Sequence, residues 1–167
     1  VVSTDDGMVV DESIRDKNYN FNNGLMKSGA LWVKLEGEYE LSGDWSVKNE
    51  VNFFDADRYW ANSEDYTYNS GTGLLDRSTT LITHDHRFWS DRIMLSQDGQ
   101  IGSFRNRFAG GYEFVQTDFS SKRRFGTTPS VDPFGFDRGY FPEDSAANFS
   151  TRQDYDSTVQ SHAIFAE

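Results

Sequence analysis

The fold is decided by residues 30–53, which read ALWVKLEGEYELSGDWSVKNEVNF. Apolar side chains occupy alternate positions on both sides of the turn residues 42–44, and most positions between them are charged or polar. Successive side chains of a β-strand point to opposite faces, so the alternation predicts a hairpin with one apolar face and one charged face. The apolar set is Leu31, Val33, Leu35, Tyr39, Leu41, Trp45, Val47, Val51 and Phe53, and the charged set is Lys34, Glu36, Glu38, Glu40, Lys48 and Glu50.

Two environments suit such a hairpin. In a soluble sandwich the apolar face forms the core, whereas in a membrane barrel it meets lipid and the charged face lines the lumen. Tyr39 and Trp45 flank the turn, where an interfacial aromatic belt would lie. The apolar face extends over about 9–11 residues, which is enough to cross a bilayer with tilt. These two features favour the membrane barrel and leave the sandwich open.

Further long strands are predicted downstream. A third strand is expected over about residues 77–96 and a fourth over about 101–119, joined by a short turn at 97–100 that contains Asp98-Gly99. In the third strand the apolar residues fall on both faces, for which a bulge is one explanation.

The connections alternate in length. Short turns follow the first and third strands, whereas long loops are expected over about 61–76 and 120–158, before a last strand that begins near Val159. Short turns on one side and long loops on the other are the rule in outer-membrane barrels, which need at least about eight strands. The predicted fold is therefore all-β, an antiparallel transmembrane β-barrel segment that is part of a larger barrel.

Composition excludes several functional classes. The chain has 167 residues, a net charge of −11, 16% aromatic residues and no cysteine. A strongly acidic chain does not suit nucleic-acid binding, and the lack of cysteine rules out a disulfide framework. No apolar stretch has the roughly 18 residues of a transmembrane helix. No nucleophile elbow, phosphate loop or acid pair indicates an enzyme.

Several motifs in the same order resemble TonB-dependent siderophore receptors. They are the segments Arg58–Tyr68, Gly73–Arg77, Phe104–Phe114, Asp118-Phe119, Val131–Phe134 and Ala163–Glu167. The resemblance implies that residues 1–167 belong to the wall of a plugged barrel of about 22 strands, with the plug and the TonB-contacting region outside these residues. It implies energised import of ferric siderophores across the outer membrane of a Gram-negative bacterium. The implied partners are the ferric siderophore, the TonB complex and outer-membrane lipid, and the iron would be carried by the siderophore rather than by a protein cofactor.

Ligand contacts are expected on the long-loop side. Aromatic residues gather there, namely Trp60, Tyr66, Tyr68, Phe134, Phe136, Tyr140 and Phe141, and Arg123 and Arg124 follow Lys122 in the densest basic cluster. Aromatic rings suit the apolar parts of a chelate and guanidinium groups suit its negative charge. The candidate ligand-binding residues are Trp60, Tyr66, Arg123, Arg124, Phe134 and Tyr140. The alternatives are loops that pack on themselves and a solvated basic cluster.

Other interpretations remain open. His84 and His86 lie on one strand face as a possible metal pair, but no third ligand is evident. The alternative function is a soluble extracellular carbohydrate-binding β-sandwich, and a third is a small outer-membrane barrel enzyme or adhesin. The barrel interpretation makes a prediction about orientation: Leu31, Val33, Leu35, Val51, Phe53, Phe104 and Phe108 face outward, and Glu36, Glu38, Arg105 and Arg107 face the lumen.

Overall fold

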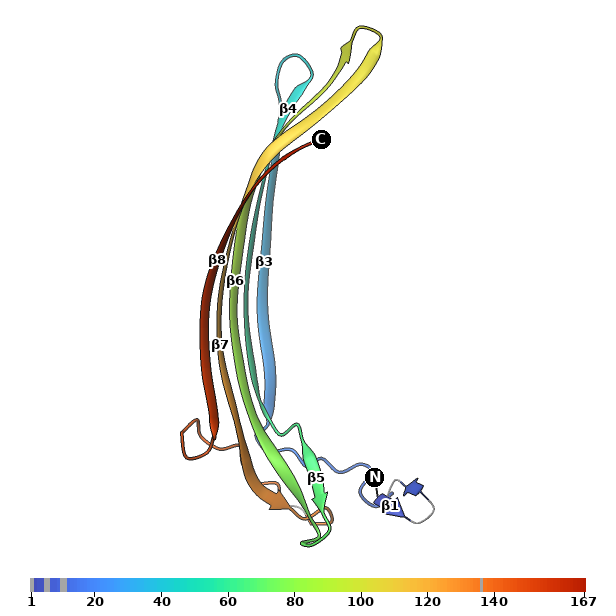
Figure 1. The fold of residues 1–167 in the computed structure, drawn as a ribbon, viewed down its shortest axis with the longest axis vertical. Coiled ribbons are helices and arrows are strands. Elements are labelled where there is room, and N and C mark those ends of the chain that lie inside the picture. The colour runs from blue at the N-terminus through green and yellow to red at the C-terminus, as the bar shows by residue number, and fades with distance from the viewer. Residues whose placement is uncertain (1, 5–6, 10–11, 136) are drawn as a thin grey trace. The chain divides into compact units, whose positions relative to one another are not determined.

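The computed structural model describes residues 2–4, 7–9, 12–135 and 137–167, and among them it is all-β and antiparallel (Figure 1). One sheet has the order β3-β4-β6-β7-β8, β5 pairs with β6, and β1 pairs with β2 in a separate ribbon. The sheet is open, because β3 and β8 lie at its two edges. The strands are β1 Val2–Thr4, β2 Gly7–Val9, β3 Leu25–Glu40, β4 Trp45–Asn62, β5 Tyr66–Asn69, β6 Leu74–Ile101, β7 Phe104–Val131 and β8 Thr151–Ala166.

The first hairpin turn is confirmed. β3 ends at Glu40 and β4 begins at Trp45, and the backbone N–H of Leu41 donates to the carbonyl of Trp45 at 2.7 Å. Gly43 and Asp44 have φ values of 73° and 63°. Glycine and aspartate are among the residues that tolerate this left-handed conformation, which is why this short sequence can reverse the chain.

Other predicted boundaries were wrong. The turn expected at 97–100 lies instead at Gly102-Ser103, with a φ of 65° at Gly102, and β6 continues through the Asp98-Gly99 pair. The loop expected over 120–158 shortens to 132–150, because β7 runs to Val131 and β8 begins at Thr151. The loop expected over 61–76 contains β5 and the start of β6. These strands continue through polar stretches because their backbones are paired with neighbouring strands. No alternation of apolar side chains indicates a strand in these stretches.

The register between β4 and β6 is unbroken along the stretch where a bulge seemed possible. Side-chain hydrogen bonds join Ser46 to Ser96 and Asn52 to Ser90. The step from Ser46 to Asn52 in β4 is six residues, and the step from Ser96 to Ser90 in β6 is also six, so neither strand has an extra residue between these pairs. The next pair, Asp55 with Arg87, continues the register by three residues on each strand. The two apolar sets of β6 therefore lie on opposite faces of a regular strand: Trp89, Ile93 and Leu95 on one face and Phe88 and Met94 on the other.

The chain forms two compact units, and the strands of the sheet contribute to both. The loop unit comprises residues 1–27, 59–82 and 122–153, and the wall unit comprises residues 28–58, 83–121 and 154–167. The loop unit has a small core, in which Phe149 is 1% exposed and packs with Ala61 and Leu81. In the wall unit, the only hydrophobic residues that are fully buried among those described are Ala56 and Ala109. The wall unit therefore has no core of large apolar side chains within its described residues.

Gly111 in β7 allows close packing in the wall unit, and replacing it should be costly. A Cβ atom at this position would lie 2.3 Å from the carbonyl oxygen of Ile93 and 2.6 Å from Cζ of Phe165. We expect Gly111→Ala to lower the free energy of unfolding by about 1–3 kcal/mol, the usual cost of overpacking. Gly37→Ala is the matched control, since its Cβ would meet no atom within 4 Å. Equal denaturant midpoints for the two variants would contradict the close packing.

Candidate functional site

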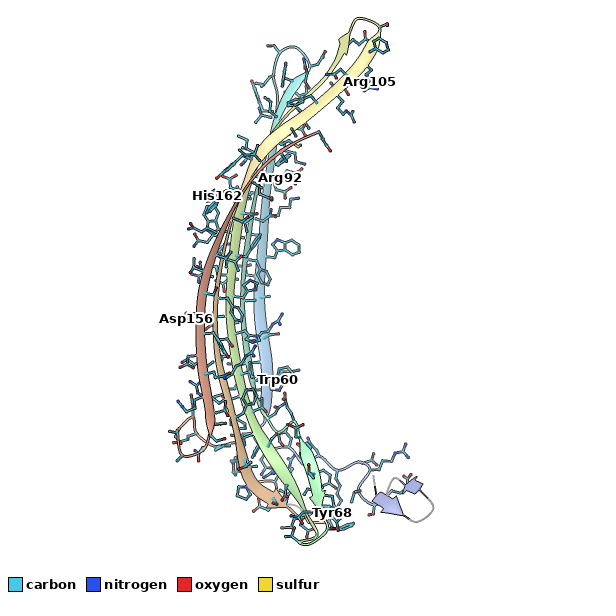
Figure 2. All side chains as sticks on the ribbon, in the orientation of Figure 1. Trp60, Tyr68, Arg92, Arg105, Asp156 and His162 are labelled. Carbon is cyan, nitrogen blue, oxygen red and sulfur yellow. The ribbon has the colours of Figure 1, made fainter. Side chains whose placement is uncertain are left out.

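One side of the wall unit forms an exposed apolar face. Leu35 is 65% exposed and Phe104 is 77% exposed, although both lie in long, regularly paired strands. Ring contacts link the strands on this side, with ring centroids 4.8 Å apart for Trp89 and Phe114 and 6.4 Å apart for Trp45 and Phe108. Figure 2 shows side chains projecting from a single layer of strands. The apolar face consists of Leu31, Val33, Leu35, Tyr39, Trp45, Val47, Val51, Phe53, Trp89, Ile93, Leu95, Phe104, Phe108, Tyr112 and Phe114.

The opposite side of the wall unit forms an ion-paired face. Lys34 Nζ lies 2.8 Å from Glu50 and 3.1 Å from Glu36, and Lys48 Nζ lies 2.8 Å from Glu36. Asn52 continues this network by donating to Glu50 and to Ser90. The predicted separation of the outward and lumen sets onto two faces thus agrees with the strand pairing, while what each face meets remains a prediction.

The apolar face has polar borders and polar pairs within it. Beyond Phe53, Asp55 pairs with Arg87 at 3.0 Å. Farther along β7, Asp118 accepts hydrogen bonds from Gln116 and Thr158, which lower the pKa of its carboxyl group. Within the face, Asn49 Nδ2 donates to Asp91 at 2.6 Å. Tyr112 of the same face is hydrogen-bonded to His162 at 2.6 Å. The apolar band is therefore bounded by polar groups along the strands and also carries polar pairs within it.

At the turn between β6 and β7, Asp98 joins two arginines of the ion-paired face. Asp98 Oδ2 lies 2.7 Å from Arg105 Nη2 and 2.9 Å from Arg107 Nη2, and Arg105 Nε donates to Oδ1 at 3.0 Å. These hydrogen bonds, from Arg105 first and then Arg107, hold the pKa of the Asp98 carboxyl well below its usual range. The two arginines expected to face the lumen are thus used to fix the hairpin end.

This arrangement predicts that the free energies of unfolding of the wild type and of Asp98→Asn differ by an amount that depends on pH. A depressed carboxyl pKa stabilises the folded state at pH values above the unfolded pKa of about 4 and loses this effect as the pH falls below it. We expect the wild type to be more stable than the variant at pH 7 and the gap to narrow below about pH 4. Unfolding by denaturant at several pH values measures the gap. Asp44→Asn is the control, because Asp44 makes no ion pair with a described residue and asparagine accepts its positive φ. A gap that is constant with pH would contradict the role of Asp98.

The six candidate ligand residues all belong to the loop unit, but the described structure does not gather them into one pocket. Trp60 is 38% exposed and Tyr140 is 74% exposed, and Phe134 is also exposed. The Tyr66 ring packs near Tyr19 with centroids 6.4 Å apart, and its hydroxyl donates to the carbonyl of Ser63. Phe136 lies outside the described residues. The aromatic residues are therefore accessible one by one rather than as a preformed vestibule.

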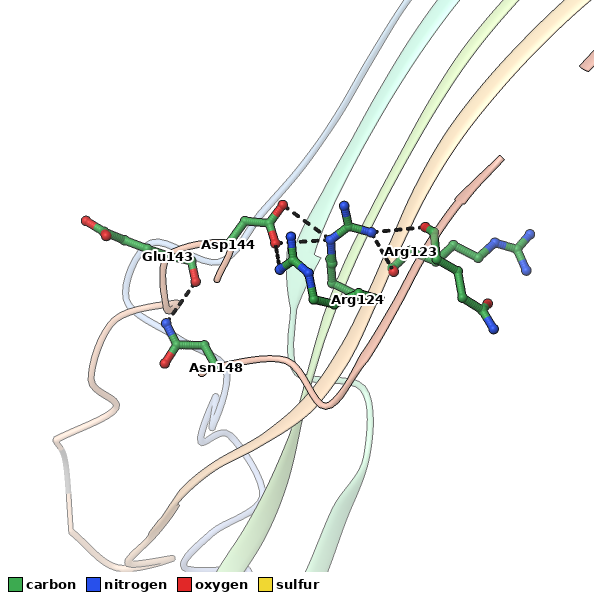
Figure 3. Close-up of polar contacts among 7 residues, drawn as sticks. Arg123, Arg124, Glu143, Asp144 and Asn148 are labelled. Atoms are coloured by element: carbon green, nitrogen blue, oxygen red, sulfur yellow. Dashed lines mark hydrogen bonds and ion pairs between the residues drawn. The ribbon is translucent and has the colours of Figure 1, made fainter. Parts of the chain in front are cut away.

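Arg123 and Arg124 lie in β7 rather than in a loop, and they differ in environment. Arg123 is exposed, whereas Arg124 is 3% exposed and donates through Nε to Asp144 at 3.0 Å. Figure 3 shows Arg124 beside Asp144, and Arg152 Nη1 donates to the same carboxylate. Alternate side chains of a strand point to opposite faces, so two neighbouring arginines cannot share one environment. The sequence cluster alone gave no means of telling which arginine is buried.

Arg77 is a residue that sequence reasoning assigned only to a motif. Its Nη1 donates to the carbonyls of Tyr19 and Arg138 at 3.0 and 2.9 Å, and its Nη2 donates to that of Pro129 at 3.2 Å. The guanidinium also lies 4.6 Å from the ring centroid of Phe21. Burial lowers the pKa of Arg77, although Tyr66 and Asp137 oppose this shift. Arg77 thus binds the segment before β3 and the loop after β7 to the ends of β6 and β7.

Metal binding finds no support among the described residues. His84 and His86 both pack against Phe119, with ring centroids 5.3 and 6.1 Å apart. No group of three or more histidine, aspartate or glutamate side chains in the described part of the chain is arranged to hold a metal ion. Helices that are long and apolar enough to cross a membrane are also absent from those residues.

Neither a family model nor a curated protein matches this chain.

Proposed function

We propose that this chain is part of the barrel wall of an outer-membrane receptor that takes up ferric siderophores with energy supplied through TonB. The observation that carries the proposal is the wall unit, an open single-layer sheet with large apolar side chains exposed on one face and ion pairs on the other. Exposed apolar surface costs about 25 cal/mol per Å² in water, and contiguous patches of this kind mark contact with lipid or another protein.

The ion-paired face supports the same assignment. A lumen of a barrel is wet, so paired charges such as Lys34 with Glu50 are tolerated there, whereas they would be expensive against hydrocarbon. Trp45 and Tyr39 at the turn end and Trp89 with Phe114 near the other border have the placement of interfacial aromatic belts. Lipid on the apolar face and water on the ion-paired face satisfy both sides of the sheet.

The siderophore and TonB parts of the proposal rest on the sequence resemblance described above. In such a receptor the iron arrives bound to the siderophore, so the protein needs no metal ligands of its own. The exposed aromatic side chains of the loop unit, Trp60 and Tyr140 among them, offer apolar contact to an organic chelate. The alternative, a soluble carbohydrate-binding sandwich, requires a second sheet on the apolar face, and the described strands form only one layer there.

The ligand part of the proposal is tested by replacing Trp60 and Tyr140 together with alanine in the intact receptor. We expect the affinity for the ferric siderophore to fall at least about tenfold, which corresponds to about 1.4 kcal/mol. The loss follows from removing two accessible aromatic surfaces on the long-loop side. Binding of a labelled ferric siderophore to reconstituted protein measures it.

Tyr39→Ala is the matched control, since Tyr39 is an exposed aromatic residue of the apolar face near the short β3–β4 turn. Its affinity should equal that of the wild type. If the double variant folds and binds as tightly as the control, ligand contact does not come from these two residues and this part of the proposal fails.

A further inference from the structure

The loop between β7 and β8 places the carboxylate of Asp144 between Arg124 and Arg152. Figure 3 shows Asp144 beside Arg124. Asp144 accepts hydrogen bonds from Arg124 Nε, at 3.0 Å to Oδ1 and 3.3 Å to Oδ2, and Arg152 Nη1 also donates to Oδ1. Arg124 belongs to β7 and Arg152 to β8, whereas Asp144 belongs to the loop. The two arginines therefore belong to paired strands, whereas the carboxylate belongs to the loop that connects these strands.

Arg124 is held in place independently of Asp144. Its Nη1 donates to the backbone carbonyls of Arg123 and Gln153, both at 3.0 Å, and its side chain is nearly inaccessible to solvent. Both carbonyls belong to paired strands, so the guanidinium stays oriented if the loop carboxylate moves away. A pre-oriented guanidinium in a partly dehydrated site is a strong receptor for an oxyanion.

Asp144 is a replaceable occupant of this site. Its side chain is 35% exposed, as is that of Arg152, so one side of the carboxylate is open to solvent. The ion pairs described here set this one carboxylate against two guanidinium groups. An anion that takes the place of Asp144 would therefore meet both arginines.

The loop is anchored just beyond Asp144. Phe149 is almost fully buried, and the backbone N–H groups of Asn148 and Phe149 donate to the carbonyl of Ser145 at 3.2 and 3.1 Å. Gly126 of β7 permits this packing, because a Cβ there would lie 2.4 Å from the carbonyl oxygen of Asn148. If Asp144 moved, the hydrogen bonds of the short turn between Asp144 and Phe149 would therefore weaken first.

We propose that Arg124 and Arg152 form an oxyanion-binding site that Asp144 occupies in the free protein, and that a carboxylate or phosphate group of a ligand replaces Asp144 and loosens the turn that follows it. The site concerns the loop unit alone and stands whether or not the protein carries a siderophore. It differs from the prediction that Arg123 and Arg124 meet the negative charge of a chelate, since access requires an exchange of one carboxylate for another anion.

Asp144→Asn tests the exchange, because it keeps the shape of the side chain and removes the internal anion. We expect inorganic phosphate and citrate, titrated by calorimetry against the intact protein, to bind the variant at least about tenfold more tightly than the wild type, about 1.4 kcal/mol. Adding Arg152→Gln to this variant should abolish the gain. Glu143→Gln is the matched control, since Glu143 contributes its backbone carbonyl rather than its carboxylate to the loop, and it should bind as the wild type does. Folded Asp144→Asn protein that binds neither anion more tightly would overturn the proposal.

A measurement on the wild type also tests whether an anion displaces Asp144, and it does not depend on the folding of a variant. Phosphate should raise the hydrogen-exchange rates of the Asn148 and Phe149 amides severalfold, and sodium chloride at the same ionic strength should leave them unchanged. Equal exchange rates in both salts would show that Asp144 is not displaced and would also overturn the proposal.

Discussion

Replacing Val33 by arginine should weaken folding of the protein in a lipid bilayer, by about 2–4 kcal/mol if Val33 lies near the bilayer midplane and by less toward the border of the apolar face. Val33 lies on the apolar face between Leu31 and Leu35 and is itself exposed. The side chains of Leu31 and Leu35, two residues away on either side in β3, are apolar, so the guanidinium would enter an apolar surface. Folding equilibria in lipid vesicles, followed by the shift of the folded band on unheated gels, measure the loss.

Trp32→Arg is the matched control for this experiment. Trp32 is the next residue along β3, its side chain is also exposed, and it lies on the ion-paired face beside Lys34 and Glu50. A new charge there stays in water, so the cost should be much smaller than for Val33. Similar losses for the two variants, or no loss for Val33→Arg, would contradict a lipid-facing apolar face.

Arg77→Met should destabilise the loop unit by about 3–5 kcal/mol, because it removes three charge-assisted hydrogen bonds and leaves partly buried carbonyl groups without their donor. The affected carbonyls belong to Tyr19, Pro129 and Arg138, in segments that are far apart in the sequence. We expect hydrogen exchange to rise in residues 18–24 and 129–141 together, while the amides of the wall unit keep their protection.

Arg58→Met is the control for Arg77→Met. Arg58 is an exposed arginine of β4, and its replacement should leave exchange in both segments unchanged. If Arg77→Met alters only one of the two segments, or neither, then the guanidinium does not hold them together and its buried position has another cause.

The sequence alone predicted the first hairpin of the wall unit well, but misplaced the turn between β6 and β7. Alternation in residues 30–53 predicted the first hairpin, its turn and the separation of Leu35 from Glu36 onto two faces, because a period of two determines which face each side chain joins. The register of β6 was not predictable from the same pattern. Phe88 and Trp89 put an aromatic ring on each face of β6, so the sequence does not show which face is apolar. The hydrogen bonds of Ser90 and Ser96 to β4 show that the strand is regular.

The loop unit was much less predictable. The stretch 120–131 carries no apolar alternation, and its strand character comes from backbone pairing with neighbours that the sequence does not identify. Arg123 and Arg124 are adjacent and chemically equal, yet only Arg124 is buried against Asp144, twenty residues away. The hydrogen bonds of Arg77 are with backbone carbonyls, which every residue possesses, so no side-chain motif can reveal them.

The central claim is that the apolar face meets lipid and the ion-paired face meets water. The chain has no cysteine, so a single introduced cysteine can carry a fluorescent label without competing thiols. Labels at Leu35→Cys and Phe108→Cys report on the apolar face, and labels at Glu38→Cys and Arg107→Cys report on the ion-paired face. The decisive measurement is quenching by brominated acyl chains in reconstituted bilayers. We expect strong quenching at the first two positions and little at the other two. Equal quenching at all four positions, or none at Leu35 and Phe108, would contradict a lipid-facing apolar face.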